Sequence, residues 1–243
     1  MIDGMRFELA TRRFPRLTVR HVRRALSWID PRFLEGLECV RLLDHNPADP
    51  DVTYMPAFLS GFLYCGSYLK RKGTRPATIA LYTDDLYFGV PQLLAASPLA
   101  GFLVASTVAH EVGHHAVEAH GFSETSEEIK LNSFIDSETE RVAATFAAQA
   151  LEKMLTSPYY RIGRYTAQLL SNRLYVMGSQ AHWKGDFKRA AALEFRAYMV
   201  NTENTDAWQA YLEDRQALLK NPSMLSDSER LWISHRRVSR PIG

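Results

Sequence analysis

Residues 97–121 read SPLAGFLVASTVAHEVGHHAVEAHG, and this stretch decides how the chain around it is expected to fold. Ser97 and Pro98 are residue types preferred at an N-cap and at the first position of a helix. Gly121 is the type preferred just after a helix ends. The spacing therefore predicts one helix about 34 Å long between them.

The pentapeptide HEVGH lies inside this predicted helix. Positions four apart share a helix face, so His110 and His114 can bind one zinc ion at about 2.0–2.1 Å each. Glu111, rotated by about 100°, lies beside the ion and can take a proton from a zinc-bound water whose pKa is about 7. Gly113 lets a neighbouring element approach closely. The pattern predicts one zinc per chain; two partly buried, hydrogen-bonded histidines are the alternative interpretation.

A catalytic zinc needs a third protein ligand, and His120 is one candidate. It stands ten residues after His110, the offset found in metzincins, in which the chain leaves the helix after the second histidine. Here that exit would fall at Val117, among residues that favour helix. If the helix continues to Gly121, His120 lies about 9 Å along the axis from the second histidine and misses the metal.

The next predicted helix, residues 137–155, offers the other candidates. Glu140 heads an apolar face that contains Ala143 and Ala147, and such small residues let two helices pack closely. Glu138 falls instead on a solvated face. Ser137 and Glu140 also fit a capping box, which would give this glutamate a structural role. We expect Glu140 to be the third ligand.

The segments before the long helix predict a helix, then a small sheet. Their elements are an amphipathic helix at 18–28, a short helix begun by Asp30-Pro31, and strands at 38–43, 54–69 (one or two), 77–82 and 86–89. Residues 77–82 form the clearest strand, expected at the edge of the sheet. The expected class is therefore α+β.

These residues resemble the gluzincin metallopeptidases. The segment AHEVGHH (residues 109–115) carries the first motif of that family. The segment ERVAATFA (residues 140–147) is similar to the Glu-x-x-Ala-x-x-Phe-Ala segment of ImmA/IrrE-like proteins and to the Glu-x-x-Ala-Asp segment of HtpX-like peptidases. The resemblance implies a zincin-like domain at 1–157, zinc on His110, His114 and Glu140, Glu111 as general base, and a peptide or protein substrate.

Residues 158–243 are expected to form an all-α extension that looks like a tetratricopeptide repeat. Gly178 fits the small residue of the repeat's first helix and Trp208 the aromatic residue that opens the next repeat. Glu194 stands where a large apolar residue is usual. One repeat is too short to stand alone, so it would pack on the first domain or bind a protein partner. An ordinary helical hairpin is an equal alternative.

Composition narrows the class of protein. The net charge of +2 gives no clear indication of nucleic-acid binding, although arginines cluster between residues 12 and 24. Two cysteines, Cys39 and Cys65, are too few for a disulfide framework and are expected to be free. Residues 1–13 lack the apolar core of a signal peptide, and no apolar run spans a bilayer. We expect a soluble, cytoplasmic protein.

The predicted activity is hydrolysis of peptide bonds by a zinc metallopeptidase. His115 is a candidate to orient Glu111, with an ordinary core or surface histidine as an equal alternative, and His182, Tyr159 and Tyr160 are candidate donors to an oxyanion. The alternative is a catalytically silent regulatory or adaptor protein that keeps the zincin fold and binds a partner through its helical extension.

Overall fold

A computed structural model describes residues 4–45, 65–88, 90–122, 138–227 and 229–230. Within these ranges the protein is α+β, as predicted, with seven α-helices and a mixed four-stranded sheet. The chain falls into two compact units. One comprises Met1–His45 with Tyr64–Thr166, and the other comprises Asn46–Leu63 with Ala167–Gly243. The domain limits 1–157 and 158–243 remain predictions.

The sheet has the order β1-β2-β4-β3. Strands β1 (Arg6–Ala10), β2 (Leu37–Leu43) and β4 (Ala77–Tyr82) run parallel, and β3 (Gly66–Leu69) pairs antiparallel with β4. The expectation that β4 is an edge strand is wrong, because β4 lies between β2 and β3 and all six of its residues are buried. Its sequence, ATIALY, carries no charge, so it can be covered on both faces and paired on both edges.

The first element is strand β1, not the predicted helix. Its five residues mix charged and apolar types and alternate too briefly to stand out, and they become a strand by pairing with β2. Two parallel strands need a crossover connection, and helix α1 (Pro15–Leu26) provides it where a helix was predicted. The turn η2 (Pro31–Leu34) follows, and the Asp30 carboxylate accepts a hydrogen bond from the Arg32 backbone N–H at 3.1 Å, as its capping role predicts.

After β4 the chain forms the short helix α3 (Thr83–Leu86), so the strand predicted at 86–89 is wrong for its described residues. The Tyr87 N–H donates to the Thr83 carbonyl at 3.1 Å, which closes a helical turn. The Thr83 hydroxyl donates to the Leu43 carbonyl at 3.1 Å and anchors that turn to the end of β2. Of the segment predicted to be extended at 54–69, residues 54–64 lie outside the described residues, and β3 occupies its end.

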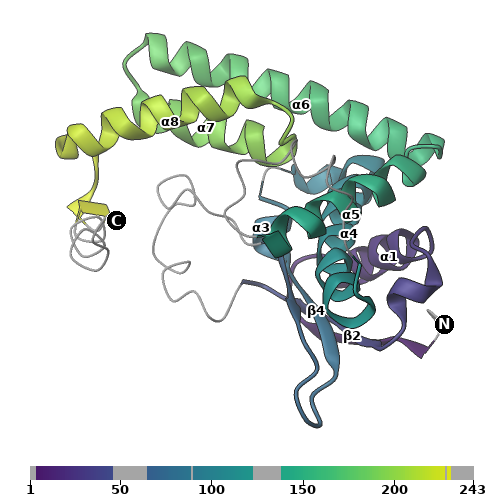
Figure 1. Ribbon diagram of the computed structural model, residues 1–243. Coiled ribbons are helices and arrows are strands. Elements are labelled where there is room, and N and C mark those ends of the chain that lie inside the picture. The colour runs from purple at the N-terminus through teal and green to yellow at the C-terminus, as the bar shows by residue number, and fades with distance from the viewer. Residues whose placement is uncertain (1–3, 46–64, 89, 123–137, 228, 231–243) are drawn as a thin grey trace. The chain divides into compact units, whose positions relative to one another are not determined.

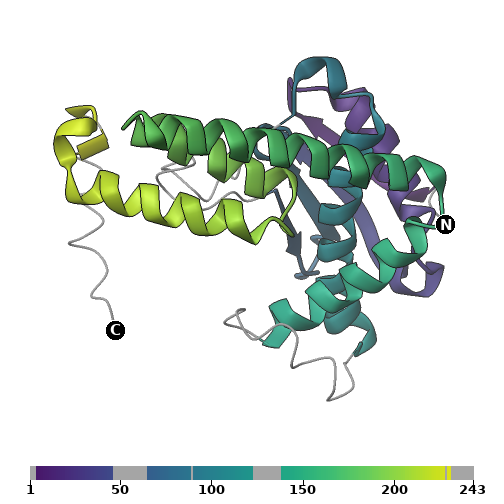
Figure 2. The same ribbon diagram turned by 90° about the horizontal axis from the view of Figure 1, so that it is seen from above.

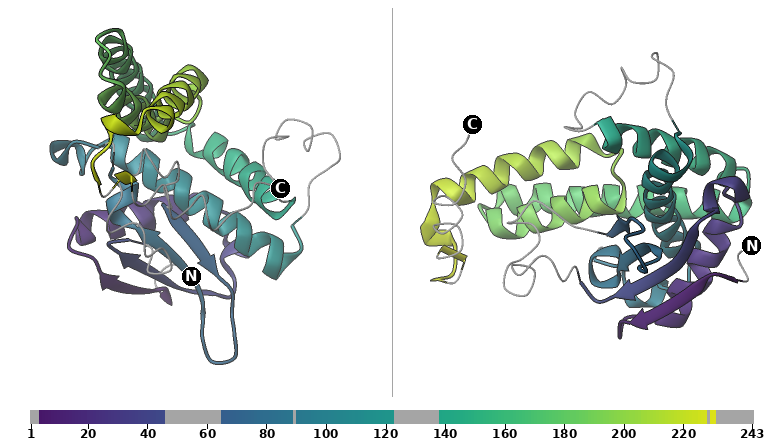
Figure 3. Two further views of the ribbon diagram at one scale, coloured as in Figure 1. Left: turned by 90° about the vertical axis from the view of Figure 1, so that its left-hand side faces the viewer. Right: turned by 60° about the horizontal axis from the view of Figure 1, so that its bottom comes forward.

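Helix α4 (Pro98–His120) packs beside α1 on the sheet (Figures 1 and 3), and α5 (Glu138–Met154) packs against α4. It begins at Pro98 and ends before Gly121, whose φ is +61°, as predicted. Ser97 stands at the N-cap, but its hydroxyl donates backward to the Leu94 carbonyl at 2.6 Å instead of capping the helix. Val108 and Val112 are fully buried, which places the apolar side of α4 in the core.

The second unit contains the end of α6 (Pro158–Trp183), α7 (Phe187–Val200) and α8 (Thr205–Lys220), which lie side by side in Figure 2. Gly178 of α6 lies so close to α7 that a Cβ there would come within 2.6 Å of the Cγ of Glu194. The glutamate at the position expected to be apolar is therefore buried against a glycine. Its neighbour on α8, Asp214, is also buried and lies 2.6 Å from the Nδ1 of His182. Short 3-10 turns complete the described elements, η4 (Gln92–Leu94) in the first unit and η6 (Pro222–Met224) in the second.

Two expectations from composition can be compared with the structure. Cys39 and Cys65 are both free thiols, as predicted. None of the helices in the described ranges combines the length and the apolar character that crossing a bilayer requires.

Candidate metal centre

Three side chains from two helices meet at one point beside the sheet. His110 and His114 come from successive turns of α4, and Glu140 comes from the first turn of α5. The two Nε2 atoms lie 3.2 Å apart, and the Glu140 carboxylate lies 3.2 Å from His110 Nε2 and 3.4 Å from His114 Nε2. The three residues predicted as metal ligands are therefore brought together, and the group can hold a metal ion.

The spacing of these atoms fits a single tetrahedral ion. Ligand atoms about 2.05 Å from a tetrahedral centre lie about 3.3 Å from one another. The 3.2 Å between the two Nε2 atoms and the 3.2 Å between His110 Nε2 and Oε2 of Glu140 match this value, and His114 Nε2 lies 3.4 Å from the other carboxylate oxygen, Oε1. Two imidazoles with one carboxylate also form a donor set that suits zinc. The residues present therefore fit a zinc ion.

The approach of α5 depends on Gly113. A Cβ at this position would lie 2.7 Å from the backbone oxygen of Ala143 and 2.9 Å from its Cα. Both partners are backbone atoms, so only glycine permits this distance. Ala143 is fully buried and stands three residues after Glu140 on α5. The contact between a glycine and an alanine thus places the glutamate within reach of the histidine pair.

The group is open on one side. The side chain of Glu140 is 48% exposed and that of His110 is 32% exposed, whereas His114 is 15% exposed. Burial lowers the pKa of His110, and the neighbouring His114 lowers it further, while Glu140 opposes both effects. A lowered pKa keeps the imidazole neutral, and the neutral form is the one that binds metal.

The side chain of Glu111, on α4, packs against strand β3. It is only 5% exposed, and a Cβ on Gly66 of β3 would lie 2.9 Å from its Oε1 atom. A backbone hydrogen bond from Tyr68 also reaches its carboxylate. Burial raises the pKa of Glu111 to about 8, the charge of Glu140 adds to that rise, and the Tyr68 hydrogen bond opposes it. Strand β3 therefore fixes the position of this carboxylate.

The role of β3 was not predicted from the sequence. Gly66 lies within a stretch expected only to form one or two short strands, and a glycine inside a strand often marks a close approach by another element. This general signal was present. It does not name the element that approaches, because the contact joins residues more than forty positions apart.

His120 and His115 lie outside the metal group. Their Nε2 atoms lie 3.0 and 2.9 Å from the carbonyl oxygen of Glu35, which can only accept, so each Nε2 carries a hydrogen and donates it. The Nδ1 of His115 then accepts from the hydroxyl of Tyr68 at 3.0 Å. Both ring nitrogens of His115 are thus occupied by Tyr68 and Glu35, and neither is left to orient the Glu111 carboxylate by a hydrogen bond.

The remaining candidates also lie elsewhere. Glu138 is exposed at the first residue of α5 and is not part of the metal group. The hydroxyl of Tyr159 lies 3.2 Å from the Nδ1 of His21, and Tyr160 is buried. His182 belongs to the second unit, where it lies against Asp214. Ser137, the other half of the predicted capping box, lies outside the described residues.

Comparison with protein-family models, with curated proteins and with solved structures finds no match to this chain. The fold and the site define the protein only as an α+β protein with a two-histidine, one-glutamate group that can hold a metal ion.

Proposed function

We propose that this protein is a zinc metallopeptidase, in which His110, His114 and Glu140 hold zinc and Glu111 is the general base. The observation that carries the proposal is the convergence of two imidazoles and the Glu140 carboxylate, with distances of 3.2 to 3.4 Å between their nitrogen and oxygen atoms, beside a carboxylate that is buried and packed against a strand. A structural zinc is usually enclosed by four protein ligands, whereas this three-ligand group is half exposed at Glu140.

Each residue has a defined task in this proposal. When bound, zinc supplies Lewis-acid chemistry, which polarises a carbonyl oxygen and makes water a nucleophile at neutral pH. Glu111 takes the proton from the attacking water and delivers it to the departing amine. Its contacts with Gly66 and Tyr68 keep the carboxylate in one place, so little conformational entropy is lost when the reaction begins.

The edge of the sheet favours a peptide as the substrate. Strand β3 pairs with β4 on one side, and in the described part of the chain no strand pairs with its other side. Such an edge presents unpaired backbone groups to which an extended peptide can add as a further strand. Because β3 contacts Glu111 through Gly66 and Tyr68, a peptide on that edge would run past the metal group.

Two substitutions test the proposal in the full-length protein. We expect wild-type protein to contain about one zinc per chain by elemental analysis, and His110→Ala to contain none. Glu111→Gln should retain the zinc and lose about 10²- to 10⁴-fold in hydrolysis of a peptide library, because the amide cannot accept the proton. Glu118→Gln is the matched control, since Glu118 lies on the same helix, is more exposed and forms only a 3.8 Å ion pair with Lys70.

The outcomes separate the functional classes. Wild-type protein that binds no zinc would refute both the metal site and the enzyme. Zinc binding without hydrolysis of any library peptide would identify the protein as a catalytically silent regulatory or adaptor protein, whose partner would bind through the tetratricopeptide-like helices. Activity that survives Glu111→Gln would remove Glu111 from its role as general base.

A further inference from the structure

A second site is indicated by a cavity at the base of the β3–β4 hairpin. The cavity has a volume of about 640 Å³, within the range of small-molecule sites. Five of its lining residues are cations, the others are uncharged, and none is acidic: the cations are Arg6, Arg41, Lys70, Lys72 and Arg75. Figures 1 and 3 show the hairpin extending past the other strands.

The two sheet arginines that line the cavity lie on the face of the sheet opposite α4. Arg6 pairs in register with Cys39 and Arg41 with Ala80, and side chains of paired residues point to the same face. Tyr68 of β3 also lines the cavity, and its hydroxyl reaches His115 of α4 on the other face of the sheet. None of the three metal-group residues and not Glu111 lines this cavity, so the proposed metal chemistry does not account for its five cations.

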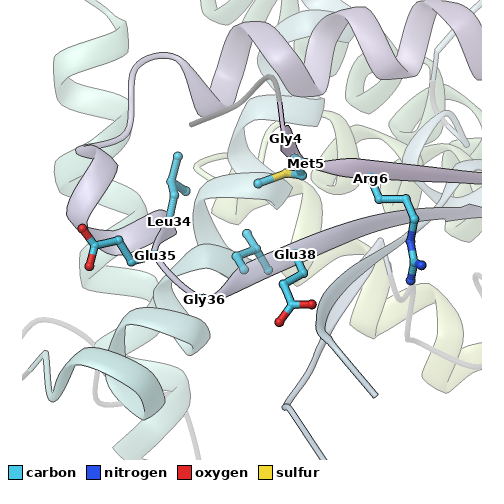
Figure 4. A pocket seen from close by; sticks show the side chains of 8 residues that line it. Gly4, Met5, Arg6, Leu34, Glu35, Gly36 and Glu38 are labelled. Carbon is cyan, nitrogen blue, oxygen red and sulfur yellow. The ribbon is translucent and has the colours of Figure 1, made fainter. Parts of the chain in front are cut away.

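A neighbouring cavity of about 540 Å³ shows that this concentration of positive charge is local. Figure 4 shows its lining, in which Glu35 and Glu38 accompany the single cation Arg6. The two cavities share only Arg6. An anion would therefore be attracted to the hairpin cavity and not to its neighbour.

One carboxylate forms ion pairs with both arginines of the sheet that line the cavity. Glu8 lies 3.0 Å from the guanidinium of Arg6 and 2.7 Å from that of Arg41. A single negative charge between two guanidinium groups leaves one positive charge uncompensated. It also holds two planar donors close together, an arrangement that suits the oxygens of a phosphate group.

The hairpin adds two cations in an unfavourable arrangement. Lys72 and Arg75 form an antiparallel bridge in which each backbone N–H donates to the other's carbonyl, at 3.3 and 3.1 Å. Like charges directly opposite each other destabilise a strand pair. Among the described residues neither side chain has an ion-pair partner, so the fold tolerates a repulsion that a bound anion would relieve.

We propose that this cavity binds a ligand that carries two or more phosphate groups. Three guanidinium and two ammonium groups line one cavity, and the two carboxylates that pair with them in the described residues, Glu8 and Glu118, leave three positive charges uncompensated. Phosphates accept the paired hydrogen bonds that guanidinium groups donate, and they place several charges within a few ångströms. A free polyphosphate compound and the backbone of a nucleic acid share this chemistry.

Binding of two probes to full-length protein tests the proposal at low ionic strength. The probes are inorganic tripolyphosphate, followed by calorimetry, and a labelled single-stranded oligonucleotide, followed by fluorescence anisotropy. We expect at least one to bind, and the double variant Lys72→Gln/Arg75→Gln to weaken it at least tenfold. For the oligonucleotide, the slope of log affinity against log salt should fall by about 1.4, because two cations are lost.

Matched variants keep the test specific. Arg20→Gln/Lys153→Gln removes the same two charges from exposed sites outside the cavity and should change affinity less than twofold. His110→Ala should leave binding unchanged, which separates this cavity from the metal group and its proposed activity. Binding of tripolyphosphate identifies a free phosphate ligand, and binding of the oligonucleotide alone identifies a nucleic acid.

Three results would overturn the proposal. The first is the absence of binding of either phosphate probe at millimolar concentration. The second is equal loss of affinity in the two double variants, which would indicate a general charge effect. The third is tighter binding of poly-glutamate than of both phosphate probes, which would indicate a surface for acidic peptides.

Discussion

Replacement of Gly113 by alanine tests whether the position of α5 controls metal binding, because the substitution leaves all three ligand side chains unchanged. The new Cβ would lie 2.7 Å from the Ala143 oxygen and 2.9 Å from the Ala143 Cα, whereas ordinary contact begins at 3.4 Å. Both opposing atoms belong to the backbone, so the two helices must separate by about 0.5 Å. Glu140 lies one turn before Ala143 and moves with its helix.

The substitution should lower stability only modestly but weaken zinc binding strongly. Overpacking costs about 1–3 kcal/mol, and alanine in place of glycine within a helix returns about 1 kcal/mol, so the free energy of unfolding should fall by at most about 2 kcal/mol. Metal sites tolerate displacements of only about 0.2 Å in a ligand distance. We therefore expect Gly113→Ala to fold and to bind zinc at least tenfold more weakly than wild-type protein.

Zinc affinity is measured by competition with a chelator, and stability by urea unfolding. Gly101→Ala is the control, because it changes the same helix at a point where the obstructing atoms belong to the side chain of Tyr159, which can turn aside. That variant should retain wild-type zinc affinity. A folded Gly113→Ala protein with unchanged zinc affinity would show that the contact with Ala143 does not position the third ligand.

The remaining predictions address the ligand, the base and the helical unit. Glu140→Ala should weaken zinc binding at least 100-fold and His120→Ala less than threefold, measured by the same competition; the reverse order would make His120 the third ligand. Gly66→Ala should lower kcat at least tenfold with zinc retained, because the new Cβ meets Glu111; a change in KM alone would contradict this. Burial raises the pKa of Glu194 to about 8, so its contribution to stability is complete below about pH 4.5 and is lost as pH rises through 8. Between pH 6 and pH 9 the Glu194→Gln variant should therefore lose less stability than wild-type protein, by on the order of 2 kcal/mol, and parallel urea curves would refute the raised pKa.

Local features of the fold were predictable from the sequence. The limits of β4 were predicted to the residue, and α4 begins after Ser97 and ends before Gly121 as expected. These features depend on residues close together in the chain, because caps, helix stops and apolar runs act within one or two turns. The common face of His110 and His114 has the same origin, since the pitch of one helix places them together.

Contacts between residues far apart in the sequence determined the remaining features of the sheet and of the metal group. Strand β1 and the central position of β4 depend on register with β2, which a run of five or six residues does not encode by itself. The sequence indicated Glu140 as a candidate from the face it shares with small residues, but only the contact between Gly113 and Ala143 decides that it reaches the histidines.

The opening segment thus specified by itself a helix that presents two histidines and a glutamate in a fixed order. The tertiary structure decided which carboxylate completes the metal group, which strand holds Glu111, and that five cations gather around one cavity at the β3–β4 hairpin. The physical reason is the distance in sequence between the residues that interact. Helix geometry fixes neighbours four residues apart, whereas the third ligand, the strand contact and the cavity each join residues brought together only by packing of separate elements.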